Sequence, residues 1–195
     1  MFQKGYVQVY TGSGKGKTTA AIGLAIRALG AGKRVLFLQF MKTKAYSEHN
    51  ILPQVSSLLT LETLGKPFFI VKEGTVPAEE LAKWGDDVVI FSPGKPPQEY
   101  LEIMRTGIDR ARQAVSSGCY DLVVLDEINV ALFFDLVTWQ QVQDIIDHKQ
   151  ESVELVLTGR GAPPELIERA DLVTEMHEVK HYYQHGVEAR IGIEN

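Results

Sequence analysis

The chain has 195 residues, of which 45% are hydrophobic and 23% charged, and its formal net charge is −5 at neutral pH. This composition is typical of one globular domain that buries roughly 70% of its unfolded surface, and the acidic balance argues against a nucleic-acid partner. A single cysteine, Cys119, excludes an intrachain disulfide and a multi-cysteine zinc site. With no signal-like segment and no apolar run of about 18 residues, we expect a cytoplasmic protein with no membrane partner.

The first part of the chain predicts a strand, a loop, a helix and a second strand. Residues 6–10 are rich in strand-forming residues and stop at a glycine-rich stretch. From Thr18 to Leu29, apolar residues recur at helical spacing. Residues 35–40, VLFLQF, are apolar almost throughout, which is typical of a parallel strand covered by helices on both faces.

The remaining elements alternate in the same way. Residues 41–53 are polar and mixed, and we expect a mobile loop there, while the polar tail 179–195 is expected to form edge structure. The patterns predict strands over 58–64, 68–71, 88–91, 122–125, 153–157 and 172–176, and helices over 77–84, 100–115, 139–146 and 163–169. This alternation predicts an α/β fold, a mostly parallel doubly wound sheet that forms a single domain over residues 1–195.

The stretch TGSGKGKTT, residues 11–19, lies between the first strand and the first helix. Its glycines let successive N–H groups turn inward, and the helix N-terminus adds partial positive charge, so the loop predicts a nucleotide-phosphate site. Lys17 would contact phosphate oxygens and the Thr18 hydroxyl would bind Mg²⁺, whereas Lys15 either adds charge or points into water. The usual first glycine of such loops is replaced by Thr11. The predicted nucleotide-binding residues are Gly12, Ser13, Gly14, Lys15, Gly16, Lys17, Thr18 and Thr19.

Polar residues also follow two later strands, at the sheet edge where ligands bind in such folds. Asp126 and Glu127 follow the strand LVVL and, with Thr18, are the predicted Mg²⁺ ligands; the alternative is a capping aspartate beside a solvated glutamate. Arg160 follows VELVLTG and would neutralise phosphate charge, unless it forms a structural ion pair. Lys180 and His181 are more typical of exposed or structural residues.

Several familiar catalytic patterns are missing from the sequence. It has no kinase-type catalytic loop containing histidine, and no residue stands out as a general base. A nucleotide-dependent reaction whose nucleophile arrives already activated would fit this pattern.

Taken together, the motifs resemble the P-loop corrinoid adenosyltransferases, which act on cob(I)alamin or cob(I)yrinic acid a,c-diamide. The resemblance covers residues 5–42 and 120–194 and is carried by VYTGSGKGKTT, LVVLDEINVAL, LTGRGAPPELIERADLVTEM, VKH and GIE. It implies a P-loop NTPase-like (RecA-like) fold in which Co(I) attacks the 5′ carbon of ATP and triphosphate leaves. It also implies Lys17, Thr18 and Arg160 as catalytic residues, Glu127 as the Mg²⁺ carboxylate, a homodimer and supply by a Co(II) reductase.

The middle of the chain departs from the family pattern. Many members carry a Phe-x-Trp segment against the corrin ring, and this chain has none. Phe68, Phe69 or Trp84 would substitute for it, or they are core residues, which is the more usual role of such side chains. Two other functions stay open: a P-loop ATPase or small-molecule kinase, and a carrier that binds nucleotide and corrinoid without turnover.

Overall fold

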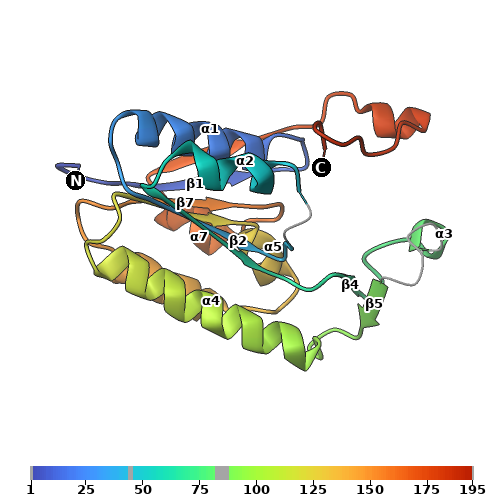
Figure 1. Ribbon diagram of the computed structural model, residues 1–195. Helices are drawn as coiled ribbons and strands as arrows, with labels where there is room; N and C mark the ends of the chain where they lie inside the picture. The colour runs from blue at the N-terminus through green and yellow to red at the C-terminus, as the bar shows by residue number, and fades with distance from the viewer. Residues whose placement is uncertain (1, 44–45, 82–87, 195) are drawn as a thin grey trace.

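A six-stranded sheet forms the centre of the computed structural model, which describes residues 2–43, 46–81 and 88–194 (Figure 1). The strands run in the order β3-β2-β6-β7-β1-β8, and every pairing between them is parallel. The bounds of these strands are β1 Val7–Thr11, β2 Val35–Phe40, β3 Leu59–Leu64, β6 Leu122–Asp126, β7 Glu154–Thr158 and β8 Leu172–Glu175. The predicted α/β fold with a mostly parallel sheet is therefore confirmed, and it is consistent with the P-loop NTPase-like class.

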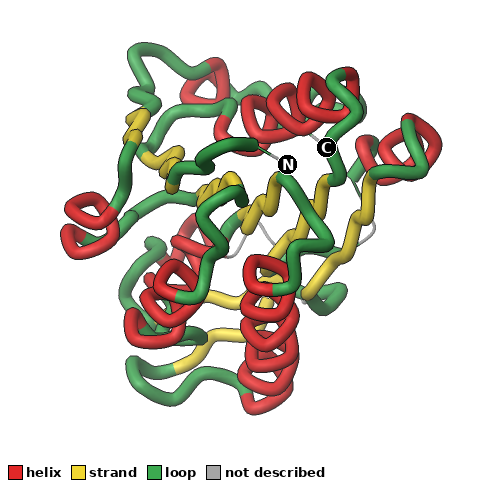
Figure 2. The backbone as a smooth tube through the Cα atoms, turned by 90° about the vertical axis from the view of Figure 1, so that its left-hand side faces the viewer, coloured by secondary structure: helices red, strands yellow, loops and turns green. Residues whose placement is uncertain are grey.

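Helices cover both faces of this sheet, as the view along it shows (Figure 2). Small residues of α1 pack on one face against alternate side chains of β2, β6 and β7. Helices α4, α5, α6 and α7 contribute to the larger apolar cluster on the opposite face. The helix bounds are α1 Lys17–Gly30, α2 Glu48–Val55, α3 Ala78–Leu81, α4 Gln98–Ser116, α5 Ile128–Phe133, α6 Trp139–Asp147 and α7 Pro164–Arg169. None of the helices in the described ranges is long and apolar enough to cross a bilayer.

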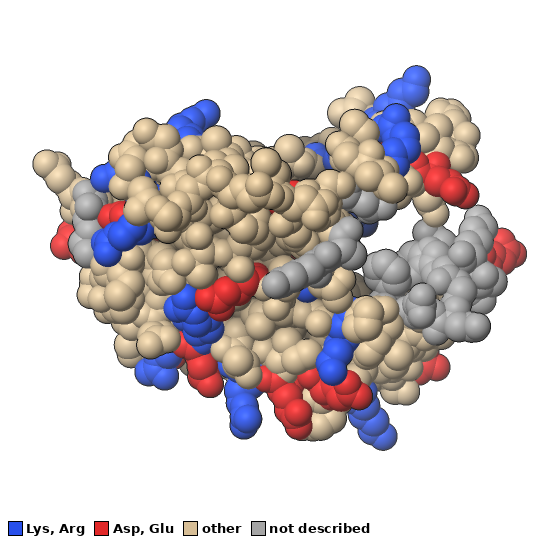
Figure 3. All heavy atoms as spheres, in the orientation of Figure 1, with Lys and Arg blue, Asp and Glu red and all other residues tan. Residues whose placement is uncertain are grey.

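The sequence patterns explain why these elements form. In α4, Tyr100, Met104, Ile108, Ala111 and Val115 are all buried, because their spacing places them on one helical face. The opposite face of α4 carries charges of both signs, which lie side by side along the lower edge of the molecule (Figure 3). The five residues of β6 are all buried, as expected for a central parallel strand.

A separate two-stranded parallel sheet lies beside the main one. Strands β4 (Phe69–Lys72) and β5 (Val88–Phe91) pair in it, and they extend from the end of the sheet near the C-terminal segment (Figure 1). Lys72 binds Asp135 with an Nζ–Oδ2 distance of 2.6 Å, which ties this small sheet to the chain after α5. The predicted helix over 77–84 is observed as α3, and its last part lies outside the described residues.

For the segments near the site, one prediction was wrong and one helix was missed. The expected loop over 41–53 contains most of α2, where the buried Leu52 anchors the helix to the body. Pro53 lies inside this helix, and its missing N–H costs only one hydrogen bond in so short an element. Helix α5 was not anticipated because it begins directly after the acidic pair and is only six residues long.

The described part of the tail, residues 179–194, forms no strand, so the prediction of edge structure there was wrong. It contains a 3₁₀ helix, η1 (Tyr182–His185), and the two edge strands of the sheet are β3 and β8. The tail stands out from the body at the same end of the molecule as β4 and β5 (Figures 1 and 3). Its exposed polar residues lack the apolar alternation that would hold a strand against the sheet, and Lys15 ties the tail to the body through Glu194 and the Ile193 carbonyl.

Candidate functional site

The phosphate loop joins the carboxyl end of β1 to α1. Lys17, the first residue of α1, folds back so that its Nζ donates to the carbonyl oxygens of Gly12 (2.8 Å) and Gly14 (2.7 Å). Only 6% of Lys17 is exposed. Burial lowers the pKa of Lys17, and the nearby Arg160 guanidinium lowers it further. A buried ammonium that is held only by neutral carbonyls would be stabilised electrostatically by an incoming anion.

Close packing by the chain after β8 explains two of the loop glycines. The Gly14 N–H donates to the Met176 carbonyl oxygen over 2.7 Å. A Cβ atom at either Gly12 or Gly14 would lie less than 3.0 Å from that same oxygen, and the φ of Gly12 is +96°. The glycine spacing of this loop therefore allows the Met176 backbone to approach it, a constraint that the sequence pattern did not reveal.

Asp126, the last residue of β6, is surrounded by donors and has no exposed surface. Its Oδ1 accepts from the hydroxyls of Thr18 (2.9 Å) and Thr158 (2.6 Å). Its Oδ2 accepts from Gln39 Nε2 (3.1 Å) and Lys42 Nζ (2.9 Å). Both carboxylate oxygens thus have two partners within the protein.

Lys42 is the positive partner of this carboxylate. It follows β2, is 9% exposed, and its Nζ also donates to Thr18 Oγ1 at 3.1 Å. Burial acts to lower the pKa of Lys42, but the charge of Asp126 and the hydrogen bond to it outweigh burial, so this pKa is raised. The ammonium also lies 5.0 Å from the centre of the Tyr46 ring. Lys42 is therefore a charged residue under the phosphate loop.

Glu127 is the carboxylate that faces open space. Its φ of +62° is unusual for a residue with a side chain, and its N–H donates to Thr158 Oγ1 at 3.0 Å. Burial and the Asp126 charge raise the pKa of Glu127, and Lys42 and Lys17 act in the opposite direction. Within the described residues no side chain donates a hydrogen bond to its carboxylate. Of the predicted acidic pair, Glu127 is the member with free oxygens.

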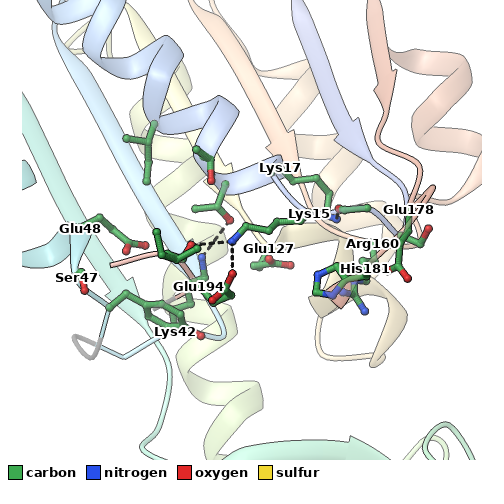
Figure 4. Close-up of a pocket in the computed structure, with 18 of the residues that line it drawn as sticks. Lys15, Lys17, Lys42, Ser47, Glu48, Glu127, Arg160, Glu178, His181 and Glu194 are labelled. Carbon is green, nitrogen blue, oxygen red and sulfur yellow. Dashed lines mark hydrogen bonds and ion pairs between the residues drawn. The ribbon is translucent and has the colours of Figure 1, made fainter. Parts of the chain in front are cut away.

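A cavity of about 530 Å³, a volume typical of small-molecule sites, lies over these residues. Figure 4 shows Glu127 near its middle, Ser47 and Glu48 on one side and Arg160 and His181 on the other. Arg160 is exposed, and its guanidinium has no hydrogen bond or ion pair in the described parts of the chain. The lining residues are Ser13, Gly14, Lys15, Gly16, Lys17, Thr18, Thr19, Ile22, Lys42, Tyr46, Ser47, Glu48, Glu127, Arg160, Glu178, His181, Gly192, Ile193 and Glu194.

The predicted site residues are thus largely gathered around one cavity, with two exceptions. Gly12 faces Lys17 through its carbonyl and does not line the cavity, and Asp126 lies beneath it. Lys15 neither reaches the loop centre nor points freely into water, because its Nζ binds the Ile193 carbonyl (2.8 Å) and Glu194 Oε1 (2.9 Å). The tail therefore forms part of the cavity wall.

A second, smaller cavity of about 190 Å³ adjoins the first, and Lys42, Tyr46 and Glu127 line both. Its other lining residues are mostly apolar: Met41, Phe68, Ile70, Tyr100, Val130 and Phe134. Phe68 packs edge-to-face on Tyr100 with ring centroids 5.6 Å apart, so it is both a core contact and a cavity residue. The side chain of Phe69 and the whole of Trp84 lie outside the described residues.

Comparisons with known proteins match almost the whole sequence. The sequence model of the family described as "ATP:corrinoid adenosyltransferase BtuR/CobO/CobP" matches residues 3–195. The chain belongs to this corrinoid adenosyltransferase family. It is 31% identical over 193 residues to a corrinoid adenosyltransferase of Escherichia coli (strain K12), a match that covers 98% of this chain and 86% of the relative. It is also 28% identical to the corrinoid adenosyltransferase CobA of Salmonella typhimurium (98% and 86% covered) and 31% identical to that of Pseudomonas aeruginosa (98% and 84% covered).

Within this adenosyltransferase, sequence reasoning missed the residues that surround Asp126. It did not predict Lys42, Gln39 and Thr158 as site residues. Gln39 and Lys42 lie at and just beyond the carboxyl end of β2, and Thr158 ends β7; both strands pair with β6. That position was the available signal, since it is the same one that marked Asp126. For Lys42, the polar, mixed appearance of residues 41–53 concealed this signal.

Proposed function

We propose that the protein transfers the 5′-deoxyadenosyl group of ATP to the Co(I) ion of a reduced corrinoid and releases triphosphate. The observation that carries this proposal is the pair of adjoining cavities. One is lined by the phosphate loop with Lys17 and Arg160, the other mainly by apolar and aromatic side chains. A nucleotide in the first would meet an apolar substrate such as a corrin ring at their shared wall.

The chemistry needs little from the protein beyond position and charge. The electron pair of Co(I) forms the new Co–C5′ bond, and the C5′–O bond breaks with its electron pair on the triphosphate oxygen, so cobalt becomes formally Co(III). No proton is transferred in this step, which agrees with a sequence in which no residue stands out as a general base. The protein's task is to align C5′ with cobalt and to stabilise the negative leaving group.

The cationic residues around the loop are placed for that task. Lys17 would exchange its bonds to the Gly12 and Gly14 carbonyls for bonds to phosphate oxygens. Arg160 would close on the triphosphate from the other wall, where its planar guanidinium has free donors. The N–H groups of the loop and of the first turn of α1 would bind the remaining oxygens.

The residues present also fit a Mg²⁺ ion carried by the triphosphate. The described residues contain no group of three or more His, Cys, Asp or Glu side chains able to hold a metal ion by themselves. Mg²⁺ in nucleotide sites needs only one or two protein ligands besides phosphates and water. The Glu127 carboxylate and the Thr18 hydroxyl would supply these, and the ion would neutralise charge on the leaving triphosphate.

Anaerobic incubation with ATP, Mg²⁺ and chemically reduced cobalamin tests the proposal. We expect the Co(I) absorption to disappear only when ATP is present, with one triphosphate formed for each adenosylcobalamin. Production of ADP without any need for corrinoid would instead establish the ATPase or kinase alternative. Corrinoid binding without loss of the Co(I) spectrum would indicate a carrier.

Four further features of the proposal rest on the family resemblance and composition alone. We propose a single catalytic domain over 1–195, a homodimer, a cytoplasmic location and a separate Co(II) reductase that supplies the substrate. Light scattering of the purified protein tests the dimer. Adenosylation that starts from Co(II) only when a reductase is added tests the last feature.

A further inference from the structure

The Lys42 ammonium occupies an unusual position below the phosphate loop. It lies 2.9 Å from Asp126 Oδ2 and 3.1 Å from Thr18 Oγ1, so it bridges the carboxylate at the end of β6 and the hydroxyl at the start of α1. Those two groups also contact each other at 2.9 Å. A loop hydroxyl beside a strand carboxylate is the donor set that hard cations prefer.

The surroundings hold the ammonium in this position. Lys42 is 9% exposed, and Asp126, which is fully buried, receives no other charged donor among the described residues. Gln39 and Thr158 occupy the remaining acceptor positions of the carboxylate. No acceptor position of Asp126 is therefore left for a metal ion while Lys42 stays in place.

We propose that Lys42 is a built-in cation that takes the Thr18–Asp126 position and keeps divalent ions from binding there before the nucleotide arrives. This inference rests on the Mg²⁺ role in the proposed function. It makes Lys42 a positioning residue: by neutralising Asp126 it leaves Glu127 as the carboxylate to which an ion can bind. The ion then enters together with the triphosphate, whose charge attracts it.

Removing the ammonium should turn the same groups into a metal site. In Lys42→Met, Asp126 is a buried carboxylate without a counter-charge, beside the Thr18 hydroxyl. A divalent ion would replace the missing charge, and we expect its affinity to rise by at least about tenfold, because a unit charge a few ångströms away in a buried site has an effect of that size or more. In Lys42→Arg the charge is kept, and no such gain is expected.

The test is a Mn²⁺ titration of the nucleotide-free protein, in which electron paramagnetic resonance measures the free aqua ion. Lys42→Met should bind Mn²⁺ at least about tenfold more tightly than the wild-type protein and the Lys42→Arg control. Adding Asp126→Asn to Lys42→Met should abolish the gain. Equal Mn²⁺ affinity in all four proteins, or a gain that survives Asp126→Asn, would overturn the proposal.

Instability of Lys42→Met would not block the test. Its unfolding temperature should then rise on addition of Mn²⁺, by more than that of the wild-type protein, because an ion that binds only the folded state stabilises it. A failure of Mn²⁺ to raise it would count against the proposal. Neither result depends on turnover, so absence of adenosylation in the wild-type protein would refute the proposed function independently.

Discussion

Replacing Asp126 by asparagine removes one charge from a fully buried carboxylate without changing its shape much. Asp126 accepts four hydrogen bonds, and an asparagine side chain can accept on only one of its two terminal atoms. Its amide nitrogen would face Thr18 and Thr158, because hydroxyls can rotate to accept. Its oxygen would face Lys42, whose ammonium would then be buried without the carboxylate with which it is paired.

The expected cost follows from this arrangement. Removing one member of a buried ion pair typically costs about 3–5 kcal/mol, and we expect Asp126→Asn to lower the free energy of unfolding by that amount. For a chain of this size this corresponds to a fall of roughly 6–20 °C in the unfolding temperature. The double variant Lys42→Met/Asp126→Asn, which removes both charges, should be more stable than the sum of the two single effects predicts, by about 1–3 kcal/mol.

Urea unfolding followed by circular dichroism measures all four proteins of this double-mutant cycle. The reasoning would be refuted by a loss of less than about 1 kcal/mol in Asp126→Asn, or by single effects that simply add. Because the pKa of Lys42 is raised above its ordinary value of 10.5, the stability that the Lys42 charge contributes should be fully present at neutral pH and disappear as the pH rises through the raised value.

Three further changes test the site. Glu127→Gln should stabilise the nucleotide-free protein at neutral pH, because burial raises the pKa of Glu127 and its ionisation therefore opposes folding. Thermal unfolding should show this gain at neutral pH and none below the ordinary pKa of 4.5. The same variant should lose Mg²⁺-dependent turnover. Lys17→Ala should weaken ATP binding by at least about tenfold in calorimetry, with Cys119→Ser, on the exposed free cysteine, as an unchanged control. Gly12→Ala should cost about 1–3 kcal/mol in urea unfolding, because its Cβ would meet the Met176 carbonyl oxygen; an equally stable variant would contradict that packing.

Sequence patterns predicted the elements whose side chains repeat with a clear period. The apolar strands 35–40 and 122–125 and the helix over 100–115 were found because burial of one face imposes that period. The phosphate loop and the acidic pair were found because each follows such a strand directly. At these positions the local sequence pattern is enough to predict where the residue lies in the fold.

Long-range contacts could not be predicted in the same way. The packing of Met176 on the loop and the bond from Lys15 to Ile193 join residues more than 150 positions apart, and no local period records them. The contact between Lys42 and Asp126 could not be predicted either, because a lysine in a polar stretch is usually solvated. Only the fold brings its ammonium to the Asp126 carboxylate. Helix α2 has a single buried residue, Leu52, and α5 has three buried residues within only six, so neither is long enough to show a full amphipathic period.

The contact between the phosphate loop and the chain after β8 has a consequence for local opening of the structure. β8 is one of the two edge strands of the main sheet, and all four of its residues are exposed. The Gly14 N–H is bonded to Met176, one residue beyond that strand, so fraying of the edge would release the loop amide at the same time. Loop and edge strand therefore form one cooperative unit, and a bound triphosphate would protect the amides of β8 from hydrogen exchange although it touches none of them.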